Sequence, residues 1–233
     1  LYHWRKAEGS VALHGDEKNY TETAAIRALQ SHFERTGSKA EVQPGFAGLR
    51  CVLYPLPSPL PLVSVVICTK DRKDLLARTL EGLLTRTNYA ALEILVVDNR
   101  SSDPETLAYL ASLPSIDPRI RVIKFDEPFS FARMNNWAVK KTKGSLVALL
   151  NNDLEMKDPE WLTSMVRHIS RPTVGAVGAK LYYPNGNIQH AGVILGLGDI
   201  AGHSHKGMPG AYPGYVRSAL ATQNLSAVTA ACM

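Results

Sequence analysis

The sequence predicts an α/β domain in which a mostly parallel β-sheet is flanked by helices. From residue 62 onward, short apolar runs alternate with longer segments whose apolar residues recur at helical spacing. The runs are apolar at almost every position, which is typical of strands buried on both faces. Regular alternation of strands and helices indicates parallel strands joined by helical crossovers.

The boundaries of these elements follow from the same periodicity. The expected strands are 62–68, 92–97, 119–124, 145–150, 174–181 and 188–195, and the expected helices are 71–85, 104–113, 131–141 and 158–170. We assign all of them to one domain over residues 61–233. The chain stops within an apolar run, so we expect this domain to be incomplete at its C-terminal end.

The first part of the chain, residues 1–60, lacks this alternation of strands and helices and predicts a small helical connector. One helix is expected, capped by Thr21 or Thr23 and followed by a strand around 49–54. Its apolar face comprises Ala25, Ile26, Leu29 and Phe33. Prolines then alternate along residues 55–61, which indicates a stiff linker and a domain boundary.

Composition restricts the class of protein. Of 233 residues, 45% are hydrophobic and 20% are charged, which is ordinary for a globular domain. The net charge of +5 is spread along the chain without a basic arm, so we expect no nucleic-acid partner. Cys51, Cys68 and Cys232 lack paired spacing and are expected to be buried free thiols in a reducing compartment.

Polar loops follow three of the expected parallel strands. They begin at Thr69, Asp98 and Asn151, and each carries carboxylates. In parallel sheets ligands bind beyond the carboxyl ends of the strands. Each loop also has a simpler interpretation, since Asp71 and Asp103 could cap helices and Asn-Asn-Asp could form a turn. Together, the three loops favour a ligand site at one edge of the sheet.

The loops also indicate how a phosphate would be held. Neither a G-x-G-x-x-G turn nor a P-loop follows the first strand. Backbone N–H groups alone are therefore not expected to bind phosphate. A cation would offset the repulsion between the acids, and hard oxygen ligands suit Mg or Mn.

At this point the sequence resembles the family 2 glycosyltransferases of the GT-A fold. The resemblance covers about residues 60–233 and rests on VSVVICT at 63–69, VVDNRSSD at 96–103, Asn136-Trp137-Ala138 with Lys143-Gly144, LLNND at 149–153, QHAGVIL at 189–195 and AVTAACM at 227–233. LLNND resembles the D-x-D metal motif with Asn at its first position. The resemblance implies a Rossmann-like sheet and a nucleotide-sugar donor.

The resemblance also implies a role for particular residues in a nucleotide pocket. Thr69 and Asp71 would line it. Asp98 would accept a hydrogen bond from the base, uracil or thymine, which predicts a UDP- or dTDP-linked donor. Asn136 would face the donor from its helix.

A divalent metal and two further contacts complete the implied site. Asn151 and Asp153 would bind the donor and hold Mg or Mn, with Asp153 the charged ligand. The metal would stabilise the diphosphate as a leaving group. Arg133 is a candidate phosphate contact, and His190 is a candidate donor or acceptor contact. The catalytic base is unknown here, because the resemblance places it beyond Met233.

The implied function is sugar transfer from a nucleotide-diphosphate sugar to a saccharide or lipid-linked acceptor in bacterial surface polysaccharide synthesis, with inversion. We expect a cytoplasmic location, with peripheral association of the parent protein at the inner face of the membrane as an option. Residues 1–10 resemble the tail of a preceding transferase domain, which predicts a tandem-domain parent. Without the base, the fragment is expected to turn over little.

Two other functions stay open at this stage. One is a non-catalytic nucleotide-binding or scaffold module of the same fold. The other is a nucleotidyltransferase, which is disfavoured because no Gly-rich, Arg-containing loop follows the first strand.

Overall fold

The computed structural model describes residues 20–197 and 200–233. The chain divides into two units, with the boundary between Pro55 and Leu56. In the first unit, helix α1 (Thr21–Arg35) is followed by an antiparallel hairpin of β1 (Glu41–Pro44) and β2 (Arg50–Leu53). The predicted cap is wrong, because Tyr20 occupies the N-cap position and provides no side-chain bond. Strand β1 was not predicted, and residues 1–10 lie outside the described residues.

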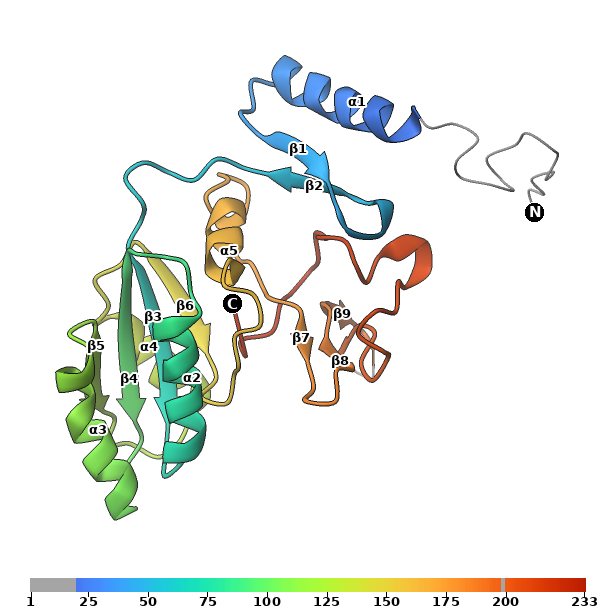
Figure 1. Ribbon diagram of the computed structural model, residues 1–233. Helices are drawn as coiled ribbons and strands as arrows, with labels where there is room; N and C mark the ends of the chain where they lie inside the picture. The colour runs from blue at the N-terminus through green and yellow to red at the C-terminus, as the bar shows by residue number, and fades with distance from the viewer. Residues whose placement is uncertain (1–19, 198–199) are drawn as a thin grey trace. The chain divides into compact units, whose positions relative to one another are not determined.

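The second unit is built on a four-stranded parallel sheet, as predicted. Its strands are β3 (Val63–Thr69), β4 (Leu92–Asp98), β5 (Ile120–Lys124) and β6 (Leu146–Leu150), in the order β5-β4-β3-β6. All three pairings are parallel, and Thr69 lies opposite Asp98. The carboxyl ends of the strands therefore share one edge (Figure 1).

Helices cover both faces of this sheet. They are α2 (Lys73–Thr85), α3 (Pro104–Ile116), α4 (Phe131–Val139) and α5 (Trp161–Ile169). One core cluster joins the sheet to α2, α3 and α5, and a second joins its other face to α4 through Met134 and Ala138. Alternate side chains of a strand point to opposite faces, so Val65 belongs to the first cluster and Val66 to the second.

The turn before β6 allows the chain to approach β3 closely. A Cβ atom at Gly144 would lie 2.5 Å from the carbonyl oxygen of Leu62 and 2.6 Å from Oγ of Ser64. The Gly144 N–H donates to Ser64 Oγ at 2.8 Å. The glycine of the Lys143-Gly144 motif is therefore required by packing at the amino edge of the sheet.

The prediction of long strands after α5 is wrong. Residues 174–180 are irregular, and β7 comprises only Leu181–Tyr182. The expected strand 188–195 is interrupted at Gly192, whose φ of +115° suits glycine, so it forms β8 (Ile188–His190) and β9 (Val193–Leu195). These strands pair antiparallel, β7 with β8 and β9 with β10 (Ala201–His203), outside the parallel sheet.

The last described residues return to the edge of the sheet. Leu150 and Cys232 form an antiparallel bridge, and Leu149 and Met233 exchange backbone hydrogen bonds of 2.8 and 3.1 Å. The Ala179 N–H donates to the Cys232 carbonyl at 3.1 Å. Residues 231–233 thus connect β6 with the segment after α5.

None of the helices in the described part of the chain has the length and hydropathy that crossing a bilayer requires. The three cysteines are free, as predicted. Cys232 is buried, but Cys68 is only partly buried, and Cys51, on the short hairpin strand β2, is exposed.

Candidate functional site

The end of β3 is bonded to the loops on both sides of it. Thr69 is buried, and its Oγ1 accepts a hydrogen bond from Asn152 Nδ2 at 3.0 Å. Its carbonyl oxygen accepts from the Asn99 N–H at 2.9 Å. The loops after β3, β4 and β6 are therefore held together at one edge, as the sequence predicted.

Asp71 connects the loop after β3 to the loop after β4. Its carboxylate accepts from the N–H groups of Ser102 at 2.6 Å and Asp103 at 2.8 Å, and its own N–H donates to Ser101 Oγ at 3.0 Å. The backbone bonds from Asp103 and Ser102 lower the pKa of Asp71. Asp71 does not cap α2, whereas Asp103 does cap α3 through the Thr106 N–H.

Asp98 ends β4 with its side chain buried. One carboxylate oxygen accepts from the Ser101 N–H at 3.0 Å. The neighbouring Asn99 amide donates to the carbonyl oxygens of Phe125 and Glu127 at 3.0 and 2.9 Å. Asn99 thus holds the loop between β5 and α4 against the site. Sequence reasoning missed this role, although an Asn directly after a buried strand is a usable signal.

The turn after β6 presents the predicted metal ligands. The Asn151 N–H donates to the Ala231 carbonyl at 2.9 Å, and Asp153 is exposed two residues later. Fully buried Thr79 on α2 fixes the following residue, because its Oγ1 bonds both the N–H and the carbonyl of Leu154 at 3.0 Å. Thr79, which the sequence did not single out, therefore positions the acidic turn.

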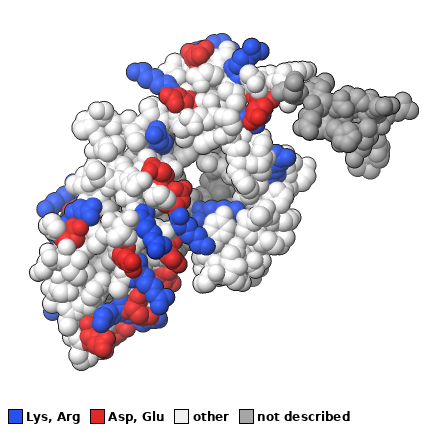
Figure 2. Space-filling model, in the orientation of Figure 1, with Lys and Arg blue, Asp and Glu red and all other residues white. Residues whose placement is uncertain are grey.

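Charge at this edge is mixed in sign. The hydrogen bonds that the Arg72 guanidinium donates to the Asp74 carboxylate are the main cause of its raised pKa, and the charge of the Asp153 carboxylate contributes as well. Lys and Arg side chains are interspersed with Asp and Glu on the face visible in Figure 2. Within the described residues, no group of three or more His, Cys, Asp or Glu side chains is arranged to hold a metal.

Helix α4 contacts β3 through Asn135, the neighbour of Asn136, which the sequence predicted as a donor contact. Asn136 is exposed, whereas Asn135 is 5% exposed. Asn135 Nδ2 donates to the Phe131 carbonyl at 2.8 Å, and its Oδ1 accepts from Cys68 Sγ at 3.7 Å. Asn135 therefore anchors the helix, which leaves Asn136 available to solvent or ligand.

Arg133 lies on the exposed first turn of α4, after the Ser130 cap. Its guanidinium forms an ion pair with Glu127, in the loop that Asn99 holds. Any contact of Arg133 with a phosphate would compete with this pair.

His190 lies on β8, away from the parallel sheet, and is 2% exposed. Its Nε2 accepts from the Gly192 N–H at 3.2 Å, and its ring packs edge-on against His203 with centroids 4.7 Å apart. Burial, with a smaller contribution from His203, lowers the pKa of His190 to about 4. The imidazole is therefore neutral at physiological pH.

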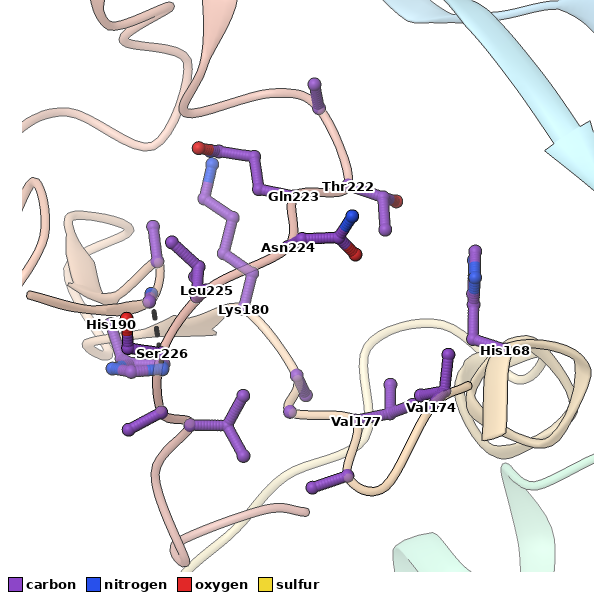
Figure 3. Close-up of a pocket in the computed structure, with 18 of the residues that line it drawn as sticks. His168, Val174, Val177, Lys180, His190, Thr222, Gln223, Asn224, Leu225 and Ser226 are labelled. Atoms are coloured by element: carbon purple, nitrogen blue, oxygen red, sulfur yellow. Dashed lines mark hydrogen bonds between the residues drawn. The ribbon is translucent and has the colours of Figure 1, made fainter. Parts of the chain in front are cut away.

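His190 is part of the wall of a cavity of about 710 Å³. The cavity is lined by residues from 168–180, 190–192 and 218–228 (Figure 3). It adjoins the sheet edge through residues 231–233, which bond to both β6 and Ala179.

Comparison with known proteins identifies the family. The sequence model of the family glycosyl transferase family 2 matches residues 64–200, and the chain belongs to this family. The fold of the sheet unit is shared with a mannosyltransferase, PcManGT from Pyrobaculum calidifontis, with a TM-score of 0.50 and 22% identity over 72% of this chain and 46% of that one. This likeness confirms the predicted GT-A fold.

Two relatives match the chain over its full length. An uncharacterised protein of Sinorhizobium fredii, y4gI, is 43% identical, and the match covers 26% of it. The O-antigen biosynthesis protein RfbC of Myxococcus xanthus is 40% identical, and the match covers 18% of it. The chain therefore spans about a quarter or less of the length of these relatives.

Proposed function

We propose that this chain provides the donor-binding part of an enzyme that transfers a sugar from a nucleotide-diphosphate sugar to a saccharide or lipid-linked acceptor, with inversion. The observation that carries the proposal is the joining of three polar loops at the carboxyl edge of the sheet, by the Asn152–Thr69 and Asp71–Ser102 hydrogen bonds. The likeness to RfbC supports a place in bacterial surface polysaccharide synthesis.

The nucleotide is assigned to the loops after β3 and β4. Asp98 has one carboxylate oxygen bonded to Ser101, and we assign its other oxygen to the N3–H of uracil or thymine. Thr69 and Asp71 line the same pocket, with Asp71 acting mainly to position the two loops. Asn136 is assigned to the donor because it is the exposed asparagine of α4.

A divalent cation fits the turn after β6 in part. Asp153 offers an exposed carboxylate and Asn151 an amide oxygen, both of which suit Mg or Mn. The remaining ligands would have to be diphosphate oxygens and water, since the described residues contain no larger acidic cluster. When bound, such an ion supplies charge stabilisation to the leaving diphosphate. The mannosyltransferase of the same fold was solved with GDP-mannose and Mn²⁺.

Nucleotide binding tests this assignment directly. Calorimetric titrations with UDP, dTDP and GDP, each with and without Mn²⁺ or Mg²⁺, are expected to give metal-dependent binding of UDP or dTDP. Asp153→Asn should weaken metal-dependent binding by about tenfold or more, because it removes the only charged ligand assigned. Glu155→Gln is the matched control, since it removes an exposed carboxylate from the same loop, where Glu155 pairs with Arg86.

The possible results separate the assignments from one another. Unchanged metal dependence in Asp153→Asn would remove that residue from the site. If neither this chain nor the longer protein binds any of the nucleotides, the enzyme proposal fails.

A non-catalytic nucleotide-binding module is the second candidate. It is favoured by Asn151, which leaves one charged ligand where a D-x-D motif has two. Release of UDP or dTDP from the sugar donor by the longer protein, at a rate above buffer alone, would exclude this candidate. The free cysteines fit a reducing compartment, so we propose a cytoplasmic location for the domain, with peripheral membrane association of the parent as an option.

A further inference from the structure

The cavity beside the sheet edge is lined by segments far apart in the sequence. In Figure 3, one side of the cavity is formed by His168, Val174 and Val177. The opposite side contains His190 and Ser226. A third wall comprises Thr222, Gln223 and Asn224. A volume of about 710 Å³ is in the range of small-molecule sites.

The wall chemistry points away from a nucleobase. Among the described residues that line the cavity, none is a Phe, Tyr or Trp, so no benzenoid or indole ring is available for base stacking. The wall instead combines hydroxyl and amide side chains with small apolar patches. This combination suits a sugar, which has hydroxyl groups at its rim and C–H groups on its faces.

Lys180 adds a cationic group to this wall, which also contains Arg171, a residue that already takes part in another interaction. No Asp or Glu occurs among the described lining residues. Lys180 is half-buried, and its Nζ donates to the carbonyl oxygens of Ala219 at 2.9 Å and Gly210 at 3.4 Å. It also lies 5.1 Å from the centre of the Tyr182 ring. Within the described part of the chain it forms no ion pair with a carboxylate. A partly buried ammonium without a counter-charge is a favourable partner for an anion.

His190 lies in the same wall and carries a buried hydrogen-bond donor without an acceptor among the described residues. Its Nε2 accepts from the Gly192 N–H, so the proton of the neutral ring is on Nδ1. That Nδ1 is buried and has no hydrogen-bond partner within the described residues. A buried N–H without an acceptor costs free energy, which an oxygen of a bound ligand would recover.

We propose that this cavity binds a saccharide that carries an anionic group, with Lys180 pairing the anion and His190 and Asn224 bonding sugar oxygens. The anion is a phosphate on the sugar or the carboxylate of a uronic acid. The occupant is the glycosyl acceptor, an assignment that rests on the proposed function. Residues 231–233 support it, because they place the cavity wall beside the turn that carries Asp153.

Binding of simple sugars in the absence of nucleotide tests the pocket. Ligand-observed NMR titrations with glucose 1-phosphate, glucuronate, glucose and inorganic phosphate compare the two anions with a neutral sugar and with phosphate alone. One of the two anionic sugars is expected to bind at least about tenfold more tightly than glucose, because a charge-assisted bond is added. Which of them binds identifies the source of the negative charge.

Matched lysine variants assign the cation. Lys180→Gln should reduce binding of the anionic sugar towards the level of glucose, with any remaining preference for the anion due to Arg171 in the same wall. Lys157→Gln should leave it within about twofold, because Lys157 contacts the same Tyr182 ring at 5.7 Å but does not line the cavity. Asn224→Ala provides a second variant on an exposed residue, in case Lys180→Gln fails to fold. It should weaken both charged and neutral sugars.

Several outcomes would overturn the proposal. They are equal binding of glucose and both anionic sugars, equal binding of inorganic phosphate and glucose 1-phosphate, and unchanged affinity in both Lys180→Gln and Asn224→Ala. UDP binding, measured separately, keeps the two proposals distinguishable. Sugar binding without binding of any of the nucleotides, by this chain or by the longer protein, refutes the donor site and leaves the pocket, and the converse refutes the pocket alone.

Discussion

Replacing Gly144 by alanine should destabilise the sheet unit through a defined steric conflict. The added Cβ would lie 2.5 Å from the Leu62 carbonyl oxygen, 2.6 Å from Ser64 Oγ and 2.8 Å from the Ser64 nitrogen. Two of these atoms are backbone, and the third belongs to a short side chain, so none can move away as the end of a long side chain would. The chain before β6 must therefore shift away from β3.

The size of the effect follows from two contributions. Overpacking at a close backbone contact costs about 1–3 kcal/mol. The shift also weakens the 2.8 Å hydrogen bond from the Gly144 N–H to Ser64, which contributes about 1 kcal/mol. Alanine also restricts the unfolded chain, which offsets about 0.4–1 kcal/mol of this destabilisation. Together these contributions give an expected net loss of about 1–3.5 kcal/mol in the free energy of unfolding.

Urea unfolding followed by tryptophan fluorescence measures this loss, since Trp137 and Trp161 both lie in the sheet unit. The midpoint should fall by about 1 M urea for a chain of this size. Gly175→Ala is the matched control, because a Cβ at Gly175 would have no neighbour within 4 Å and its φ is not in the left-handed region. If the two variants differed by less than about 0.5 kcal/mol, the steric reasoning would be wrong.

Two further predictions concern stability and pH. The pKa of His190 is about 4 in the native state and about 6.5 in the unfolded chain. The stability that the buried neutral ring contributes is therefore complete above pH 6.5 and is lost as pH falls towards 4. When the pH is lowered from 7.5 to 5, the free energy of unfolding of the wild type should fall by ~2 kcal/mol more than that of His190→Gln. Equal decreases in the urea midpoints of the two proteins would contradict this. Thr79→Val should cost about 1–3 kcal/mol and weaken metal-dependent UDP binding, because both backbone bonds to Leu154 are lost. Thr85→Val on the same helix, where the hydroxyl bonds an exposed carbonyl, should leave both measurements nearly unchanged.

The parallel sheet and its ligand edge could be predicted because their signals are local. Strands β3 and β4 are almost entirely buried, so their sequences are apolar at successive positions and stand out from the helices between them. Polar residues follow directly where these strands end. The parallel arrangement then places Thr69 opposite Asp98 without further information.

The segment after α5 could not be predicted because its pairing depends on distant residues. Residues 174–180 are apolar enough to resemble a strand, but the Ala179 N–H bonds to Cys232 rather than to a neighbouring ladder. Periodicity on α4 identified the helix but not which asparagine faces β3. The buried position belongs to Asn135 because its amide reaches both Phe131 and Cys68, a contact fixed only by the packing of α4 on the sheet.

One short segment connects the donor edge with the cavity. Ala231 accepts from the Asn151 N–H, and Cys232 accepts from the Ala179 N–H next to Lys180. The turn that carries Asp153 and the wall that carries Lys180 are therefore bonded to neighbouring peptide groups of the same strand-like segment. A displacement of either one must strain or break a backbone hydrogen bond to this segment, at about 1 kcal/mol each. The structure thus links the positions of the proposed metal ligand and the proposed acceptor cation, as transfer between two bound substrates requires.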